Sequence, residues 1–199
     1  QGMIFFGMLG LVMIVWGIPF GYYNTFVIEE RHGFNRQTVK SFVLDQIKGI
    51  ALGAVLGGGI LYVILYIMGS MGPYWWLWAW AAVSGFSIFT AWIYPTLLAP
   101  LFNKFTPLED GELKNEIHKL AHKIRFKTNG LFVMDASRRT SHGNAYFTGL
   151  FGKKRIVLFD TLLDALNVQE IVAVLAHELG HFKLHHVRWM LLRSIVVTG

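Results

Sequence analysis

The chain has 199 residues, the length of one ordinary domain, but 54% of them are hydrophobic and only 15% are charged, which indicates a membrane protein. It has no cysteine, which excludes disulfides and thiolate ligands, so any metal must be held by nitrogen and oxygen donors. The formal charge of +6 does not indicate a nucleic-acid partner, because the basic residues lie among acidic ones beside apolar runs, where Lys and Arg flank a bilayer.

The two ends of the chain are both apolar. It begins with Gln1 rather than Met, and it stops at Gly199 within an apolar run. This predicts an internal piece of a longer protein. The beginning lacks the basic start and the small-residue cleavage site of a signal peptide, so we expect it to be the remainder of a spanning helix.

Three apolar stretches are long enough to cross a membrane as helices, at about residues 1–19, 47–68 and 74–98. Pro19 is expected to end the first of them, and a polar loop is expected over residues 22–45. The sequence therefore predicts a mainly α, polytopic membrane protein.

The charges beside the second and third spans predict an orientation. The turn at residues 70–73 has no Lys or Arg. The segments on either side of this helical hairpin carry Arg31, Arg36, Lys40, Lys48, Lys104, Lys114, Lys119, Lys123 and Arg125. Because Lys and Arg concentrate on the cytoplasmic side of membrane proteins, we expect both flanking segments to lie there.

The chain is expected to divide into transmembrane helices over residues 1–100 and a catalytic region over residues 101–199, in which a further spanning helix starts at about residue 187. Three short extended segments, rich in β-branched and aromatic residues, predict a small sheet. They are residues 131–134, 144–150 and 155–159. A helix precedes them, because apolar residues recur at helical spacing at Leu113, Ile117, Leu120, Ala121 and Ile124.

His118 and His122 lie four residues apart in this expected helix. Two such imidazoles could in principle bind a metal ion. No carboxylate lies between them in a useful apolar context, so the favoured interpretation is a solvated helix face.

The segment at residues 144–147 is a candidate for binding a substrate in extended form, because an extended peptide can hydrogen-bond to an open sheet edge. Ala145 would permit close approach of the backbone, and Asn144 could hold a substrate carbonyl. A plain structural β-hairpin is the alternative that the sequence leaves open.

The pattern H-E-x-x-H runs from His177 to His181 in an expected helix. Residues four apart lie one turn above each other, so both imidazoles can bind one tetrahedral zinc ion and leave positions for another protein ligand and a water. Glu178 stands beside the first ligand, where its carboxylate can take a proton from the water that attacks a peptide carbonyl.

The pattern is short, so ordinary polar surface is the alternative interpretation. The apolar residues 171–176 lead directly into the motif, and ionisable groups on so apolar a helix are costly without a partner, which favours a metal site. Asn167 and Glu170 predict the helix start as a capping-box-like pair. His185 shares the face of the motif but lies about 12 Å along the axis from His177, too far to bind the same ion at about 2 Å.

Four further stretches are distinctive when they are taken together with the motif helix. They are Y-N-T-F-V-I-E-E-R-H-G-F-N at 23–35, Y-P-T through F-N-K-F at 94–105, S-H-G-N-A-Y-F-T-G at 141–149 and K-R-I-V-L-F-D-T-L-L at 154–163. With the motif helix they cover most of the chain. In this order they resemble the type I CaaX prenyl proteases, which are integral-membrane zinc metallopeptidases of the gluzincin type.

The resemblance implies a bundle of seven spanning helices around a large intramembrane chamber, with the zinc site at its cytoplasmic end. It implies that His177 and His181 bind one zinc ion and that Glu178 is the general base. It also implies that Asn144 and Ala145 lie on a substrate-aligning strand. The third zinc ligand would be a Glu beyond the last residue of this chain.

The expected function is that of a membrane-embedded zinc metalloendopeptidase acting on C-terminal CaaX peptides of prenylated proteins or on other membrane-associated peptides. With one ligand missing, this chain alone is expected to bind zinc weakly and to be inactive. A non-catalytic membrane scaffold or quality-control component that retains the motif is the alternative. A metal-binding transporter segment is disfavoured, because charged residues are missing from the interior of the middle two spans.

Overall fold

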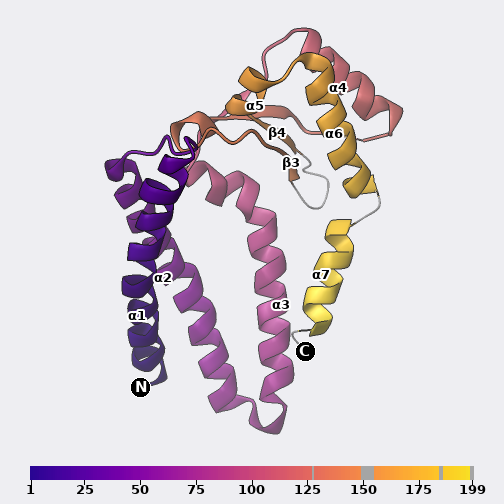
Figure 1. Cartoon of the computed structure of the whole chain (residues 1–199). Helices are drawn as coiled ribbons and strands as arrows, with labels where there is room; N and C mark the ends of the chain where they lie inside the picture. The colour runs from indigo at the N-terminus through magenta and orange to yellow at the C-terminus, as the bar shows by residue number, and fades with distance from the viewer. Residues whose placement is uncertain (127, 149–154, 184–185, 198–199) are drawn as a thin grey trace. The chain divides into compact units, whose positions relative to one another are not determined.

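The structure is a computed structural model that describes residues 1–126, 128–148, 155–183 and 186–197 (Figure 1). Side chains are described for these residues except within 181–188 and at 191, 194 and 196. The chain forms two compact units, residues 1–89 and residues 90–197. The described part is mainly helical with one four-stranded sheet, which confirms the predicted fold class.

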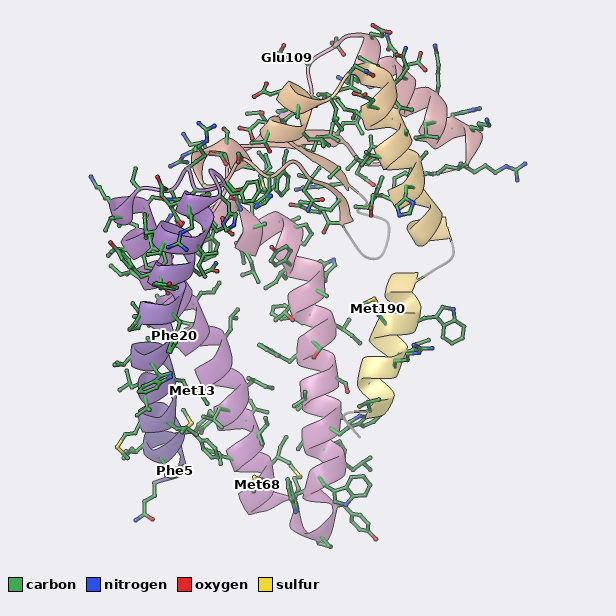
Figure 2. All side chains as sticks on the ribbon, in the orientation of Figure 1. Phe5, Met13, Phe20, Met68, Glu109 and Met190 are labelled. Carbon is green, nitrogen blue, oxygen red and sulfur yellow. The ribbon has the colours of Figure 1, made fainter. Side chains whose placement is uncertain are left out.

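Among the described residues, three helical segments are long and apolar enough to cross a membrane. Their main helices are α1 (Gly2–Tyr23), α2 (Val39–Ser70) and α3 (Trp75–Ile93). Short helical turns adjoin them: η1 (Asn24–Glu29), η2 (Gly72–Tyr74), η3 (Tyr94–Leu98) and η4 (Ala99–Leu101). The apolar side chains of Phe5, Met13 and Phe20 project from α1 and are exposed, as expected of a helix whose surroundings are lipid (Figure 2).

The first predicted span ends too early. The sequence places a break at Pro19, but α1 runs through this proline to Tyr23. That prediction is wrong because spanning helices tolerate proline, since neighbouring groups can satisfy the carbonyl that it frees. The third predicted span, residues 74–98, lies within the apolar helical segment Gly72–Leu101.

The polar segment before α2 is shorter than the loop predicted over residues 22–45. The prediction is wrong at its N-terminal end, because the backbone stays helical from α1 through η1 to residue 31. It is wrong at its C-terminal end because Thr38 caps α2, where its Oγ1 accepts a hydrogen bond from the N–H of Ser41 at 3.2 Å. Charged residues that follow this cap belong to the first turns of the helix. The remaining loop is held by side chains, among them Asn35, whose Nδ2 donates to Glu30 Oε2 at 2.8 Å.

The sheet of the second unit has the strand order β1-β2-β4-β3. The strands are β1 (Phe105–Pro107), β2 (Leu131–Met134), β3 (Ala145–Thr148) and β4 (Arg155–Phe159). β2 and β4 are parallel, whereas β1 and β3 run antiparallel to their neighbours at the two edges. β2 and β4 have their predicted bounds. β3 is shorter than predicted within the described residues, because residues 149–150 lie outside them, and β1 was not predicted.

Four helices complete this unit: α4 (Glu112–Lys123), α5 (Asp160–Ala165), α6 (Val168–Lys183) and α7 (His186–Val197). α4 and α6 pack side by side over one face of the sheet (Figure 1). The core between them includes Ile117 from α4, Ile156 and Leu158 from β4, and Leu175 from α6, all fully buried. Each such side chain contributes about 1.5–3 kcal/mol on burial, so this layer fixes α6 against the sheet.

Candidate functional site

The start of α6 is set by two reciprocal hydrogen bonds. The N–H of Asn167 donates to Glu170 Oε2 at 2.9 Å, and the N–H of Glu170 donates to Asn167 Oδ1 at 3.0 Å. This confirms the predicted capping pair. Because the cap fixes where the helix begins, it also fixes which residues of α6 face the core.

The buried face of α6 is a stripe of Ile171, Leu175 and Leu179, which are 2%, 0% and 1% exposed. His177 lies off this stripe and is exposed, and Glu178 is half-buried. The sequence argument that the ionisable groups of the motif are costly without a partner therefore does not hold for His177. The apolar residues are concentrated on one face, so His177 does not need a partner to offset burial.

His177 and His181 both lie in the continuous helix α6, four residues apart. The helix places them one turn above each other, as the motif predicts. The side chain of His181 lies outside the described part of the chain, so no ligand geometry is drawn from it. Two imidazole donors at this spacing fit two positions of a zinc ion, which takes nitrogen ligands readily. Among the side chains that the structure describes, no group of three or more metal-ligating residues occurs.

Gly180, between Glu178 and His181, has free space around it. A Cβ built on this residue would have no described neighbour within 4 Å. The motif helix is thus open on the flank where Gly180 lies.

The predicted substrate-binding strand is an edge strand. β3 pairs with β4 on one side, and no described strand pairs with its other side. The N–H of Phe159 in β4 donates to the carbonyl oxygen of Asn144 at 2.9 Å. Successive residues of an antiparallel strand direct their N–H and C=O groups alternately to one side and the other. The main-chain groups of Ala145 and Phe147 therefore point to the open edge. α6 packs against β3, so the structure brings the motif helix and this strand together.

Asn144 and Ala145 have different surroundings. Asn144 is exposed, and its Oδ1 accepts a hydrogen bond from the N–H of Ala145 at 2.8 Å. Its Nδ2 is therefore the donor left for another molecule, which fits the prediction that Asn144 could hold a carbonyl. Ala145 is 4% exposed and belongs to the buried cluster that contains Leu175 and Leu179. Its small side chain allows α6 to lie close to β3.

A group of residues that the sequence analysis missed fixes the start of β3. Asp160 Oδ1 accepts hydrogen bonds from the N–H groups of Ser137 and Thr161, both at 2.8 Å. Thr161 Oγ1 donates to the carbonyl oxygen of His142 at 2.8 Å. α5 thereby holds the segment that leads into Asn144. An Asp directly after a predicted strand was the available signal, because such residues often cap the helix that follows.

Tyr146 lies on the other face of β3 from Ala145. Burial, with a smaller contribution from Tyr94, raises the pKa of the Tyr146 phenol to about 12. Its hydroxyl donates to Met134 Sδ at 3.9 Å. The phenol is therefore neutral at physiological pH, and it packs against the buried cluster of Met134, Ala136 and Val157.

Two family models match the chain. The model "CAAX prenyl protease N-terminal, five membrane helices" matches residues 1–104, and the model "Peptidase family M48" matches residues 107–198.

Curated relatives are similar over nearly the whole chain. The CAAX prenyl protease 1 homolog of Arabidopsis thaliana is 52% identical over 173 residues, 86% of this chain and 41% of the relative. The CAAX prenyl protease 1 of Saccharomyces cerevisiae is 44% identical over 201 residues, 100% of this chain and 44% of the relative. The chain thus spans less than half the length of these relatives.

A solved structure has the same fold. The crystal structure of S. mikatae Ste24p superposes with a TM-score of 0.94 at 44% sequence identity, covering 100% of this chain and 47% of that one.

Proposed function

Because this chain belongs to the CAAX prenyl proteases of peptidase family M48, we propose that it forms part of a membrane-embedded zinc metalloendopeptidase. The observation that carries the proposal is the packing of α6, with His177 and Glu178, against the edge strand β3. This packing supports the proposal because it brings the helix that carries Glu178 beside the open edge strand. Residues 1–100 would supply spanning helices and residues 101–199 the peptidase region, which agrees with the extents of the two family matches.

In this proposal His177 and His181 hold one zinc ion, together with a Glu from a part of the protein that this chain does not contain. When bound, the ion polarises the peptide carbonyl and lowers the pKa of a water molecule. Glu178 takes a proton from the attacking water and returns it to the leaving amine. Its half-buried position favours this role, because partial burial strengthens the interaction of a carboxylate with a nearby proton donor.

The substrate would bind in extended form along β3. The carbonyl oxygen of Ala145 and the main-chain groups of Phe147 would pair with the peptide, because the N–H of Ala145 already donates to Asn144 Oδ1. Asn144 Nδ2 would donate to one of the peptide's carbonyl oxygens. The names of the relatives support CaaX-type processing of prenylated proteins. Other membrane-associated peptides are a further substrate class in this proposal.

We place the peptidase region on the cytoplasmic side of an integral, multi-pass membrane protein. The support is the charge pattern, in which Lys and Arg flank the hairpin of α2 and α3 while its turn has none. The 199-residue chain alone would bind zinc weakly and lack turnover, because it supplies two of three protein ligands.

The test is zinc content and peptidase activity of the full-length protein carrying His177→Ala or His181→Ala. We expect each variant to lose bound zinc and activity together, whereas the wild type holds about one zinc ion per molecule. His32→Ala is a suitable control, because His32 lies in the first unit, where its ring contacts the carbonyl oxygen of Ile28 and stacks on Phe34. Full zinc content in both motif variants would refute the ligand assignment.

A further inference from the structure

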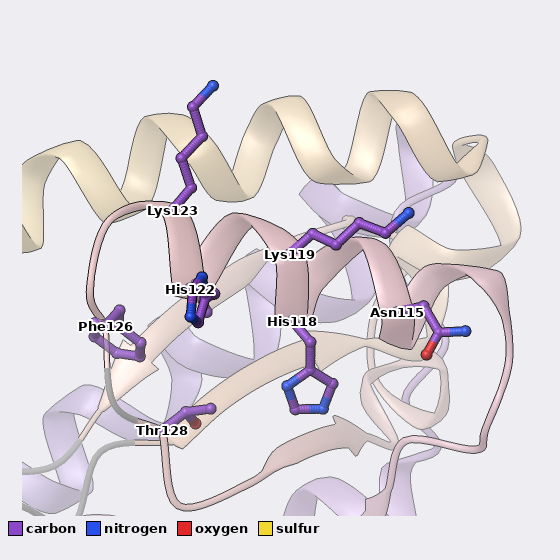
Figure 3. A pocket seen from close by; sticks show the side chains of 8 residues that line it. Asn115, His118, Lys119, His122, Lys123, Phe126 and Thr128 are labelled. Carbon is purple, nitrogen blue, oxygen red and sulfur yellow. The ribbon is translucent and has the colours of Figure 1, made fainter.

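A second pair of histidines lies on α4, outside the site on α6. His118 and His122 both line an open concavity of about 1030 Å³ (Figure 3). Its other lining residues are Asn115, Lys119, Ala121, Lys123, Phe126 and Thr128. Both histidines are exposed, which agrees with the predicted solvated face. Exposure alone does not explain why the two rings share one concavity.

The geometry of α4 brings the two rings together. His118 and His122 are four residues apart, so their Cβ atoms lie about 5–6 Å from each other on one side of the helix. Asn115 stands one further turn before them and lines the same concavity. The opposite side of α4 is anchored in the core by Ile117 and Ala121, which are 0% and 3% exposed. A rigid helix therefore presents two ring nitrogens and one amide oxygen on the same face.

Both imidazoles are available to an external ligand. In the part of the chain that the structure describes, neither His118 nor His122 forms a hydrogen bond or an ion pair. Phe126 is 8% exposed and packs edge-on against Phe147 at 5.5 Å, so the apolar end of the concavity is fixed.

The neighbouring lysines do not turn the concavity into an anion site. Lys119 Nζ pairs with Glu116 Oε1 at 2.6 Å, which offsets its charge. Lys123 extends away from His118 and Thr128 (Figure 3). Lys119 and Lys123 also line the concavity, but an ammonium group has no lone pair for a metal ion, whereas imidazoles are preferred ligands of Zn²⁺, Ni²⁺ and Cu²⁺.

We propose that His118 and His122, with Asn115 as a weaker oxygen ligand, bind one divalent transition-metal ion on α4. This site is separate from the motif helix and does not depend on peptidase activity. Binding across one helical turn would hold α4 rigid, and α4 packs directly against α6.

The experiment uses Cu²⁺ as the probe, because it binds imidazole most strongly of these ions and gives an electron paramagnetic resonance signal that reports nitrogen ligands. The full-length protein in detergent carries His177→Ala and His181→Ala, so that the motif does not compete. We expect one bound Cu²⁺ with two nitrogen ligands, and a loss of affinity of about tenfold or more in His118→Ala and in His122→Ala.

The matched control keeps the number of histidines but moves one ring. His122→Ala combined with Lys123→His places the second ring on another side of α4 and should bind as weakly as His122→Ala alone. Asn115→His should tighten binding, because it adds a third ring nitrogen on the same face. Unchanged affinity and an unchanged spectrum in the His118→Ala/His122→Ala double variant, with circular dichroism showing an intact fold, would overturn the proposal. Binding of inorganic phosphate in place of Cu²⁺, lost in the same double variant, would overturn it in favour of an anion site.

Discussion

The N–H of Phe159 donates to the carbonyl oxygen of Asn144 at 2.9 Å, and this bond sets the register of the edge strand. It turns the main chain of Asn144 toward β4 and that of Ala145 toward the open edge. The strand that the sequence singled out for substrate binding thus has a defined set of outward-facing groups, and each can be tested.

Asn144→Asp in the full-length protein should lower peptidase activity without lowering stability. The carboxylate can still accept the hydrogen bond from Ala145, but it cannot donate to a substrate carbonyl. The lost interaction is worth about 1 kcal/mol, or about fivefold in kcat/KM. Asn144→Ala is the comparison, because it also removes the acceptor and should reduce thermal stability. Equal activity in wild type and Asn144→Asp would remove Asn144 from the substrate site.

Ala145→Leu should destabilise the second unit by about 1–3 kcal/mol, because the added atoms overpack the layer between β3 and α6. Chemical denaturation of the protein in detergent measures the change. Ala145→Gly serves as the control and should cost about 1–2 kcal/mol, because it adds backbone entropy to the unfolded chain and removes one buried methyl group. An unchanged free energy of unfolding in Ala145→Leu would mean that α6 does not lie close to this position.

Thr161→Val should weaken the contact that holds the segment before β3. The change removes the hydrogen bond to the His142 carbonyl and costs about 1 kcal/mol of unfolding free energy. In the full-length enzyme KM should rise, because the Asn144 segment is held less firmly. Thr161→Ser keeps the hydroxyl and should behave like the wild type, so a defect of equal size in both variants would contradict the assigned contact.

Tyr146 predicts a pH dependence of stability. Its folded-state pKa is raised to about 12 from the ordinary value of 10.0. The stabilisation it contributes is therefore present below pH 10 and is lost as the pH rises from 10 to 12, because the unfolded chain ionises first. Since the side chain is partly open to water, the effect is smaller than the full shift implies. Denaturation midpoints between pH 9 and 12 should fall less steeply in Tyr146→Phe than in the wild type.

The sequence predicted the elements whose patterns are local. β2 and β4 have regular apolar runs, and the Asn167–Glu170 pair marks the start of α6 directly. β1 was missed because a three-residue edge strand ending in Pro107 has little pattern to detect. The break at Pro19 was predicted by rules for water-soluble helices, which a spanning helix does not obey.

The site itself was only partly accessible from sequence. The motif named His177, Glu178 and His181, but the exposure of His177 follows from which face of α6 meets the core. The role of Asp160 depends on bringing Ser137 beside it, across 23 residues of chain. Long-range contacts of this kind depend on the strand order of the sheet, which local spacing does not contain.

The most direct test of the central claim is a paired assay of zinc content and peptidase activity in full-length Glu178→Gln. The account predicts that activity is lost while about one zinc ion per molecule is retained, because the carboxylate moves a proton and does not bind the metal. Glu170→Gln, which makes the same change on the same helix and keeps the capping oxygen, should leave both quantities unchanged. Full peptidase activity in Glu178→Gln would contradict the claim that this residue is the general base.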